Sequence, residues 1–273
     1  MRLEQHHLKG DVISYRESPN RSGPFGPDLP DTVVIHFTAG ASLDSSVTAL
    51  CDPHHRASAH CAVGRDGRVV QLVPFDTKAW HAGRSSYGGR DGFNHYAIGI
   101  EIDNAGQLQR SGTQFVSWFG RSYPENQVLE AVHRNQTTPA FWHRYTDEQI
   151  AAVQEICFLL KEHYPIGTIL GHEEIAPTRK VDPGPAFPLD KLREHVFGSN
   201  RAEVGPAETC IEVRIGFVDA GRLNIRSAPA RAAATVAPPL ERGTRVAVRT
   251  ESGGWSEVDV AIRGWVKSEY LRF

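Results

Sequence analysis

The sequence predicts an α/β domain, in which helices pack against a β-sheet, followed by a small all-β barrel. In the first part of the chain, short apolar runs rich in β-branched residues alternate with a helical apolar pattern. Interleaved strands and helices of this kind form layered structures rather than helical bundles. From residue 209 onward, only short β-type runs separated by Gly-rich turns remain, which predicts a separate barrel.

Four segments of the first domain are predicted strands. The run TVVIHF at 32–37 is continuously apolar and β-branched, which is typical of a strand covered on both faces, so we expect it at the centre of the sheet. The segments AHCAV and RVVQLV flank the turn GRDG, where an Asp-Gly pair adopts positive φ at little cost, and they predict a β-hairpin. YAIGIEI at 96–102 is another predicted strand.

A long amphipathic helix is predicted over 147–163. Thr146 and Gln149 have the spacing of a capping box, which satisfies free amides at a helix start. Apolar residues then recur at helical spacing until Pro165, which cannot continue a helix.

The composition changes near GSNRAEVGPAE, residues 198–208, where small, polar, Gly and Pro residues replace the periodic apolar pattern. We therefore expect a first domain over 1–198, with a core at about 30–190. A linker is expected at 199–208 and the barrel at 209–273.

The overall composition excludes several classes of partner. The chain has 273 residues, 40% hydrophobic and 23% charged, as is ordinary for a globular protein, with a net charge of -2 and no basic run, which disfavours nucleic acid. The most apolar helical stretch, IAAVQEICFLL, is shorter than the ~20 residues that cross a bilayer. The segment MRLEQHHLKG has no apolar core and is not a secretory signal as written.

Two histidines and an aspartate are candidate metal ligands: His36 in TVVIHFTAG, His172 in ILGHEEIAP and Asp182 in RKVDPGPAF. Each has an ordinary alternative, because a histidine in an apolar strand is more often a core residue and Asp-Pro-Gly is commonly a turn. Together, however, they form the set of two imidazoles and one carboxylate that holds catalytic zinc and leaves a fourth position open.

Four separated motifs resemble one known family. HFTAG, SAHCAVGRDGRVVQLVPFDTKAWHAG, NHYAIGIEIDN and GHEEIAPTRKVDPGPAF are similar, in order and form, to the amidase-2 family of N-acetylmuramoyl-L-alanine amidases, in its AmpD-like branch. The resemblance covers roughly residues 30–190. It implies a mixed central β-sheet flanked by helices, which peptidoglycan-recognition proteins share.

The resemblance also implies roles for five residues. His36, His172 and Asp182 match the family's zinc ligands, Glu101 its catalytic carboxylate and Lys180 the cation beside the metal. The chemistry is consistent, because zinc lowers the pKa of its water to roughly 7, a carboxylate can move the proton and a cation can stabilise the oxyanion. The alternatives are a solvated glutamate at a strand end and an ordinary surface lysine.

Trp80, His81 and Gly83 in AWHAG resemble the wall of the family's substrate cleft, where an aromatic ring covers apolar substrate surface and His81 is expected to hydrogen-bond the substrate. An equally weighted alternative places Trp80 in the core and uses His81 to cap a loop.

The chain departs from the compact pattern by an insertion at about 105–145, which is rich in aromatic residues. Because it follows the strand that bears Glu101, we expect it to form one wall of the cleft and to restrict which muropeptides enter. The alternative is a surface elaboration packed away from the metal.

The C-terminal pattern LNIRSAP, GTRVAV, GGW and GWVKSEYL resembles a bacterial SH3 domain, a module often found beside wall hydrolases. Exposed aromatic residues on such a barrel could dock a peptide cross-link or a glycan. Trp255 and Trp265 could equally form its core.

The resulting functional hypothesis is hydrolysis, with one zinc ion, of the amide between N-acetylmuramic acid and L-alanine in peptidoglycan or muropeptides. The main alternative is a non-catalytic peptidoglycan-recognition protein that binds muropeptides. A general zinc peptidase ranks last, because HExxH is absent. The SH3-like module favours the bacterial cell envelope or periplasm, whereas the missing secretory signal leaves the cytoplasm open. The sequence leaves the oligomeric state open.

Overall fold

The computed structural model describes residues 1–198, 214–230, 233–242, 244–252 and 255–259. The chain divides into two compact units, Met1–Glu203 and Val204–Phe273. The linker predicted at 199–208 lies outside the described residues.

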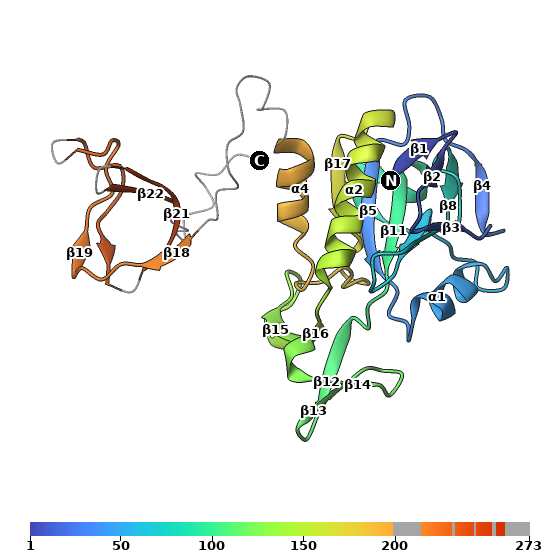
Figure 1. Cartoon of the computed structure of the whole chain (residues 1–273), viewed down its shortest axis with the longest axis horizontal. Coiled ribbons are helices and arrows are strands. Elements are labelled where there is room, and N and C mark those ends of the chain that lie inside the picture. The colour runs from blue at the N-terminus through green and yellow to red at the C-terminus, as the bar shows by residue number, and fades with distance from the viewer. Residues whose placement is uncertain (199–213, 231–232, 243, 253–254, 260–273) are drawn as a thin grey trace. The chain divides into compact units, whose positions relative to one another are not determined.

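A six-stranded mixed sheet forms the centre of the first unit, in the order β17-β5-β11-β6-β7-β3 (Figure 1). Its strands are β3 (Ile13–Tyr15), β5 (Thr32–Phe37), β6 (Cys61–Val63), β7 (Val69–Gln71), β11 (Ala97–Ile102) and β17 (Thr168–Gly171). The prediction of a central strand is confirmed, because β5 pairs in parallel with both β11 and β17. The predicted hairpin is also confirmed, since β6 and β7 pair antiparallel.

Helices cover both faces of this sheet. The predicted helix is confirmed as α2 (Asp147–His163), and its start carries the expected capping box between Thr146 and Gln149. Together with α4 (Leu189–Gly198), it buries the face of β5 that carries Val33 and Ile35. The short helix α1 (Leu43–Leu50) packs on Ala62 and Val70, which alternate to the opposite face.

Short elements complete the first unit around the sheet. Three strand pairs lie outside it: β1 (Arg2–Glu4) with β2 (His7–Lys9), β4 (Arg21–Pro24) with β8 (Thr77–Ala79), and β9 (Ser86–Tyr87) with β10 (Arg90–Asp91). The remaining helical turns are η1 (Phe93–His95), η2 (Glu125–Gln127) and α3 (His172–Ile175).

The inserted segment folds into a sheet of its own, which Figure 1 shows below the six-stranded sheet. This sheet is antiparallel and runs β14-β13-β12-β16-β15. Its strands are β12 (Gln107–Ser111), β13 (Gln114–Val116), β14 (Ser122–Tyr123), β15 (Val128–Val132) and β16 (Pro139–His143). A small separate core around Leu108 and Val128 stabilises it, with Phe115 and Phe141 packed against that core. The aromatic residues of the insertion therefore have a structural use.

The described part of the second unit is all-β. A three-stranded antiparallel sheet joins β18 (Arg214–Phe217), β21 (Arg245–Ser252) and β22 (Trp255–Asp259), and β19 (Arg222–Leu223) pairs with β20 (Leu240–Glu241). Val218, Leu240 and Val246 form its small core. Trp255 is half-buried, whereas Trp265 lies outside the described residues.

Across the described residues of both units, no helix combines the length and the apolar character that crossing a membrane requires.

Candidate metal centre

The sheet register brings the two candidate histidine ligands together. His36 lies near the carboxyl end of β5, and His172 begins α3 directly after the last residue of β17. In this parallel pair Ile35 lies opposite Gly171, so the next residue of each strand is a candidate ligand. The carboxyl ends of adjacent parallel strands are a common position for functional groups in α/β sheets.

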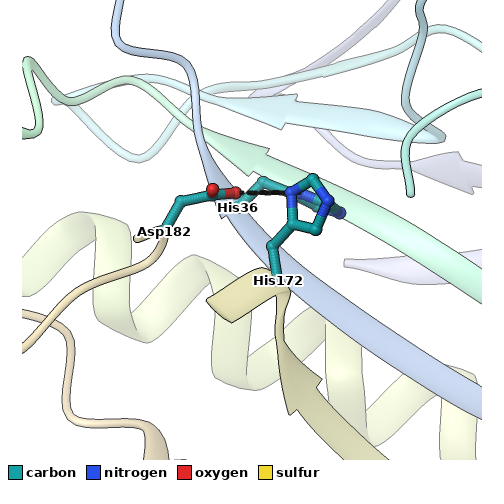
Figure 2. A group of neighbouring side chains, drawn as sticks. All are labelled: His36, His172 and Asp182. Atoms are coloured by element: carbon teal, nitrogen blue, oxygen red, sulfur yellow. Dashed lines mark hydrogen bonds and ion pairs between the residues drawn. The ribbon is translucent and has the colours of Figure 1, made fainter. Parts of the chain in front are cut away.

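Asp182 completes a compact group with these histidines (Figure 2). The Nδ1 atoms of His36 and His172 are 2.9 Å apart, and Oδ2 of Asp182 lies 3.1 Å and 2.9 Å from them, respectively. All three residues are buried. The structure thus brings together three side chains that lie up to 146 positions apart.

The hydrogen bond of Nε2 of His172 determines the protonation of Nδ1, the ring nitrogen that faces Asp182 and His36. Its Nε2 lies 3.2 Å from the carbonyl oxygen of Ala82. A carbonyl can only accept a hydrogen bond, so Nε2 carries the proton. In the neutral ring, Nδ1 of His172 therefore presents a lone pair toward Asp182 and His36.

His36 is oriented in the same way through His81. Nε2 of His81 donates to the carbonyl oxygen of Ala97 at 2.9 Å, which leaves Nδ1 of His81 as an acceptor. Nε2 of His36 lies 3.0 Å from that acceptor and donates to it, so Nδ1 of His36 also presents a lone pair. A second residue that fixes the tautomer of a metal-binding histidine is a common feature of metal sites.

His81 itself is buried, and both of its ring nitrogens have partners inside the protein. Gly99 makes room for it, because a Cβ at that position would lie 2.3 Å from Cγ of His81. The arrangement gives His81 a positioning role toward His36. Its expected hydrogen bond to substrate stays a prediction.

The three donor atoms fit a zinc ion. Tetrahedral zinc with bonds of about 2.0–2.1 Å has neighbouring donor atoms about 3.4 Å apart. The observed separations of 2.9–3.1 Å approach this value, so movements of a few tenths of an ångström suffice. Two imidazole nitrogens and one carboxylate oxygen are also a donor set that zinc accepts.

The protonation states suit metal binding. Burial, reinforced by the neighbouring His172, lowers the pKa of His36 to about 4, so its ring is neutral near pH 7. A neutral imidazole and an ionised carboxylate are the forms that bind a metal.

Glu101 and Lys180 lie beside the same group. Glu101 is opposite His36 in the β11–β5 register, and its Oε2 is buried without a hydrogen-bond partner in the described part of the chain. Burial, with repulsion from Asp182, raises the pKa of Glu101 to about 8. The Lys180 ammonium lies close enough to lower the pKa of both Glu101 and His36.

Trp80 and Gly83 flank His81 in the sequence. The indole Nε1 of Trp80 donates to Oγ of Ser22 at 2.8 Å, and the ring is partly exposed. Gly83, at φ +55°, faces the Arg179 guanidinium and borders a cavity of about 770 Å³. Their contact with substrate stays a prediction.

The structure adds two residues that sequence reasoning missed, His133 and Glu173. Oε2 of Glu173 accepts from Nε2 of His133 at 2.7 Å and from the Gly184 amide at 3.0 Å. The Glu173 amide donates to the Asp182 carbonyl oxygen at 2.8 Å. His133 belongs to the insertion, which therefore supports the segment carrying His172 and Asp182. In the sequence, the acidic residue directly after His172 could have indicated a role for Glu173, whereas no local pattern indicated a role for His133.

Comparisons with known proteins show which proteins this chain resembles. The family described as N-acetylmuramoyl-L-alanine amidase (Amidase_2) matches residues 26–185. The 1,6-anhydro-N-acetylmuramyl-L-alanine amidase AmpD of Salmonella typhimurium is 31% identical over 72% of this chain and 97% of its own length. The protein of the same name from Escherichia coli is 32% identical over 71% and 96%. A crystal structure of a selenomethionine AmpD derivative matches with a TM-score of 0.51 and 31% identity, covering 72% of this chain and 99% of that one.

Gly99→Ala is expected to weaken zinc binding about 10- to 100-fold, the usual cost of losing a partner that orients a ligand. The added methyl group displaces His81 and frees the tautomer of His36. Competition with a chromogenic chelator measures the affinity. Gly167→Ala is the control, because its Cβ meets nothing within 4 Å. Wild-type affinity in Gly99→Ala, or equal losses in both variants, would contradict the role of His81.

Glu101 predicts a pH dependence for the metal-free protein. Its folded pKa of about 8 exceeds the ordinary 4.5, so between these values the folded state holds a proton that the unfolded state has released. The contribution of Glu101 to the free energy of unfolding therefore falls as pH rises through this window. Urea unfolding at pH 5.5 and 7.5, in chelator, should show a smaller fall for Glu101→Gln than for wild type. Identical pH dependence in the two proteins would disprove the shift.

Proposed function

This chain belongs to the N-acetylmuramoyl-L-alanine amidase family, and we propose that His36, His172 and Asp182 hold one zinc ion at its reaction centre. The chain is an enzyme that hydrolyses the amide between the muramoyl group and L-alanine. When bound, zinc polarises the scissile carbonyl and lowers the pKa of a water molecule to near 7.

One observation supports the metal more than any other: one nitrogen or oxygen atom from each of three buried side chains converges at separations of 2.9–3.1 Å. Two hydrogen bonds orient the histidine rings: His172 bonds the carbonyl oxygen of Ala82, and His36 bonds His81. Lone pairs at this separation repel one another unless a cation or a proton lies between them. A resident dication removes the repulsion in all three pairs at once.

Glu101 is the proposed general base and acid. Its carboxylate takes a proton from the attacking water and then delivers that proton to the nitrogen of the departing L-alanine. The position opposite His36 places it beside the donor group. Although burial raises its pKa to about 8, a neighbouring dication favours the ionised form, so the carboxylate is available as a base near neutral pH.

Lys180 is the proposed stabiliser of the oxyanion that forms when water adds to the scissile carbonyl. Its ammonium lies near both His36 and Glu101 and is two residues from Asp182. A fixed positive charge in a partly buried site favours the charged intermediate more than the neutral substrate. A surface lysine without this placement would not affect the two buried groups.

The proposed substrates are muropeptides, and relatives named for the 1,6-anhydro sugar make that form the first to test. We further propose that residues 209–273 form an SH3-like module that binds the wall, which would raise the local concentration of enzyme on a polymer. An antiparallel sheet with a small apolar core and the half-buried Trp255 support this assignment. Such a module would favour action at the cell envelope.

A non-catalytic receptor that only binds muropeptide is the competing function. It would have no need for a complete donor set or for a buried carboxylate held beside it. The presence of Glu101 and Lys180 next to the three candidate ligands favours the enzyme.

Cleavage of N-acetylmuramoyl-L-alanyl peptide by the full chain tests this proposal, with the released peptide measured by mass spectrometry. We expect release with zinc and none after chelation. Glu101→Gln should lower kcat roughly 10²- to 10⁴-fold and Lys180→Met roughly 10²- to 10³-fold. Glu162→Gln, on an exposed position of α2, is the matched control. Binding of the substrate without peptide release under every condition would establish the receptor instead.

A further inference from the structure

A small cavity separates the insertion from the six-stranded sheet. Its volume is about 240 Å³, which lies below the roughly 300–1,000 Å³ of pockets for whole drug-sized ligands. One wall comes from the segments that follow β5 and β11, at Gly40 and Asp103, and the other from Arg121 and His143 of the insertion. The size suits one end group of a larger molecule.

His143, one of the residues that line this cavity, carries a buried donor without a partner in the described part of the chain. Nδ1 of His143 accepts a hydrogen bond from the Ala105 amide at 3.2 Å, so the proton of the neutral ring lies on Nε2. His143 is only 5% exposed, and its Nε2 has no hydrogen-bond partner among the residues that the structure describes. Burial, together with the charges of Arg65 and Arg121, lowers the pKa of His143 to about 3, which keeps the ring neutral. A buried N–H of this kind requires an acceptor.

The charges that line the cavity favour an anion. Arg65 and Arg121 contribute two positive charges, and Asp103 contributes one negative charge. Nη1 of Arg65 donates to the carbonyl oxygen of Arg144 and to Oε1 of Gln149, and Nη1 of Arg121 donates to the carbonyl oxygen of Ala41. The Arg121 side chain also has a hydrogen bond with Tyr123. The other N–H groups of each fork can bind an incoming carboxylate. The Asp103 carboxylate already accepts a hydrogen bond from the backbone amide of Leu43.

The cavity also lies within reach of the reaction centre. Asp103 is two residues beyond Glu101, and Gly40 is four residues beyond His36. At no more than ~3.6 Å per residue, these backbone positions are within about 7 Å and 14 Å of the two site residues. An extended peptide that begins at the scissile amide covers this distance in a few residues.

We propose that this cavity binds a carboxylate of the substrate's peptide, with Arg121, Arg65 and the Nε2–H of His143 as donors. The inference rests on the proposed amidase function and assigns a specificity role to the insertion. The carboxylate must come from the peptide, because the lactyl carboxyl of the muramoyl group is already the acyl part of the scissile amide. This role is more specific than the general cleft wall expected from the sequence.

The test compares two substrates: one N-acetylmuramoyl-peptide with free peptide carboxylates, and the same compound with every carboxylate converted to a carboxamide. The amide has nearly the same size but no charge. For the wild-type protein we expect KM to rise about tenfold or more on amidation, the usual worth of a hydrogen bond to a charged group. In Arg121→Gln the KM ratio of the two substrates should fall toward one.

Arg110→Gln is the matched control, because Arg110 is an exposed arginine of the same insertion and does not line the cavity. It should keep the wild-type KM ratio, and thermal unfolding checks that both variants are folded. Equal KM for the two substrates in the wild-type protein, or an unchanged ratio in Arg121→Gln, overturns the inference while the amidase function stands. Failure of the wild-type protein to cleave either substrate removes both.

Discussion

Three lone pairs face one another inside the first unit, on Nδ1 of His36, Nδ1 of His172 and Oδ2 of Asp182. Their mutual repulsion is the physical constraint on which the rest of this site depends. Parallel pairing of β5 with β17 fixes the two histidines at the same edge of the sheet. Pairing of β5 with β11 places Glu101 beside them. A dication held by these three atoms would replace the mutual repulsion with attraction.

Residues behind the donor atoms keep them in place. His81 fixes the tautomer of His36, and it fits only because residue 99 has no side chain. On the other side, His133 of the insertion bonds Glu173, which in turn holds the backbone around Asp182. The insertion thus contributes to the site through buried hydrogen bonds, and its other edge lines the cavity to which we assign substrate recognition.

Local patterns in the sequence predicted much of the fold. The apolar run of β5, the Asp-Gly hairpin and the capping box of α2 each depend on neighbouring residues, and each is confirmed. The donor group was proposed from three residue types that suit zinc and from a family resemblance, because nothing local shows that residues 146 positions apart will meet. The sheet of the insertion and the His133–Glu173 pair were missed for the same reason: both depend on contacts that only tertiary packing creates.

Zinc K-edge X-ray absorption on the full chain loaded with one equivalent of zinc tests the central claim most directly. The account predicts a first shell of nitrogen and oxygen donors at about 2.0–2.1 Å that includes two imidazoles, and one imidazole fewer in His172→Ala. A shell of water oxygens alone, sulfur donors, or a spectrum that His172→Ala leaves unchanged would contradict it.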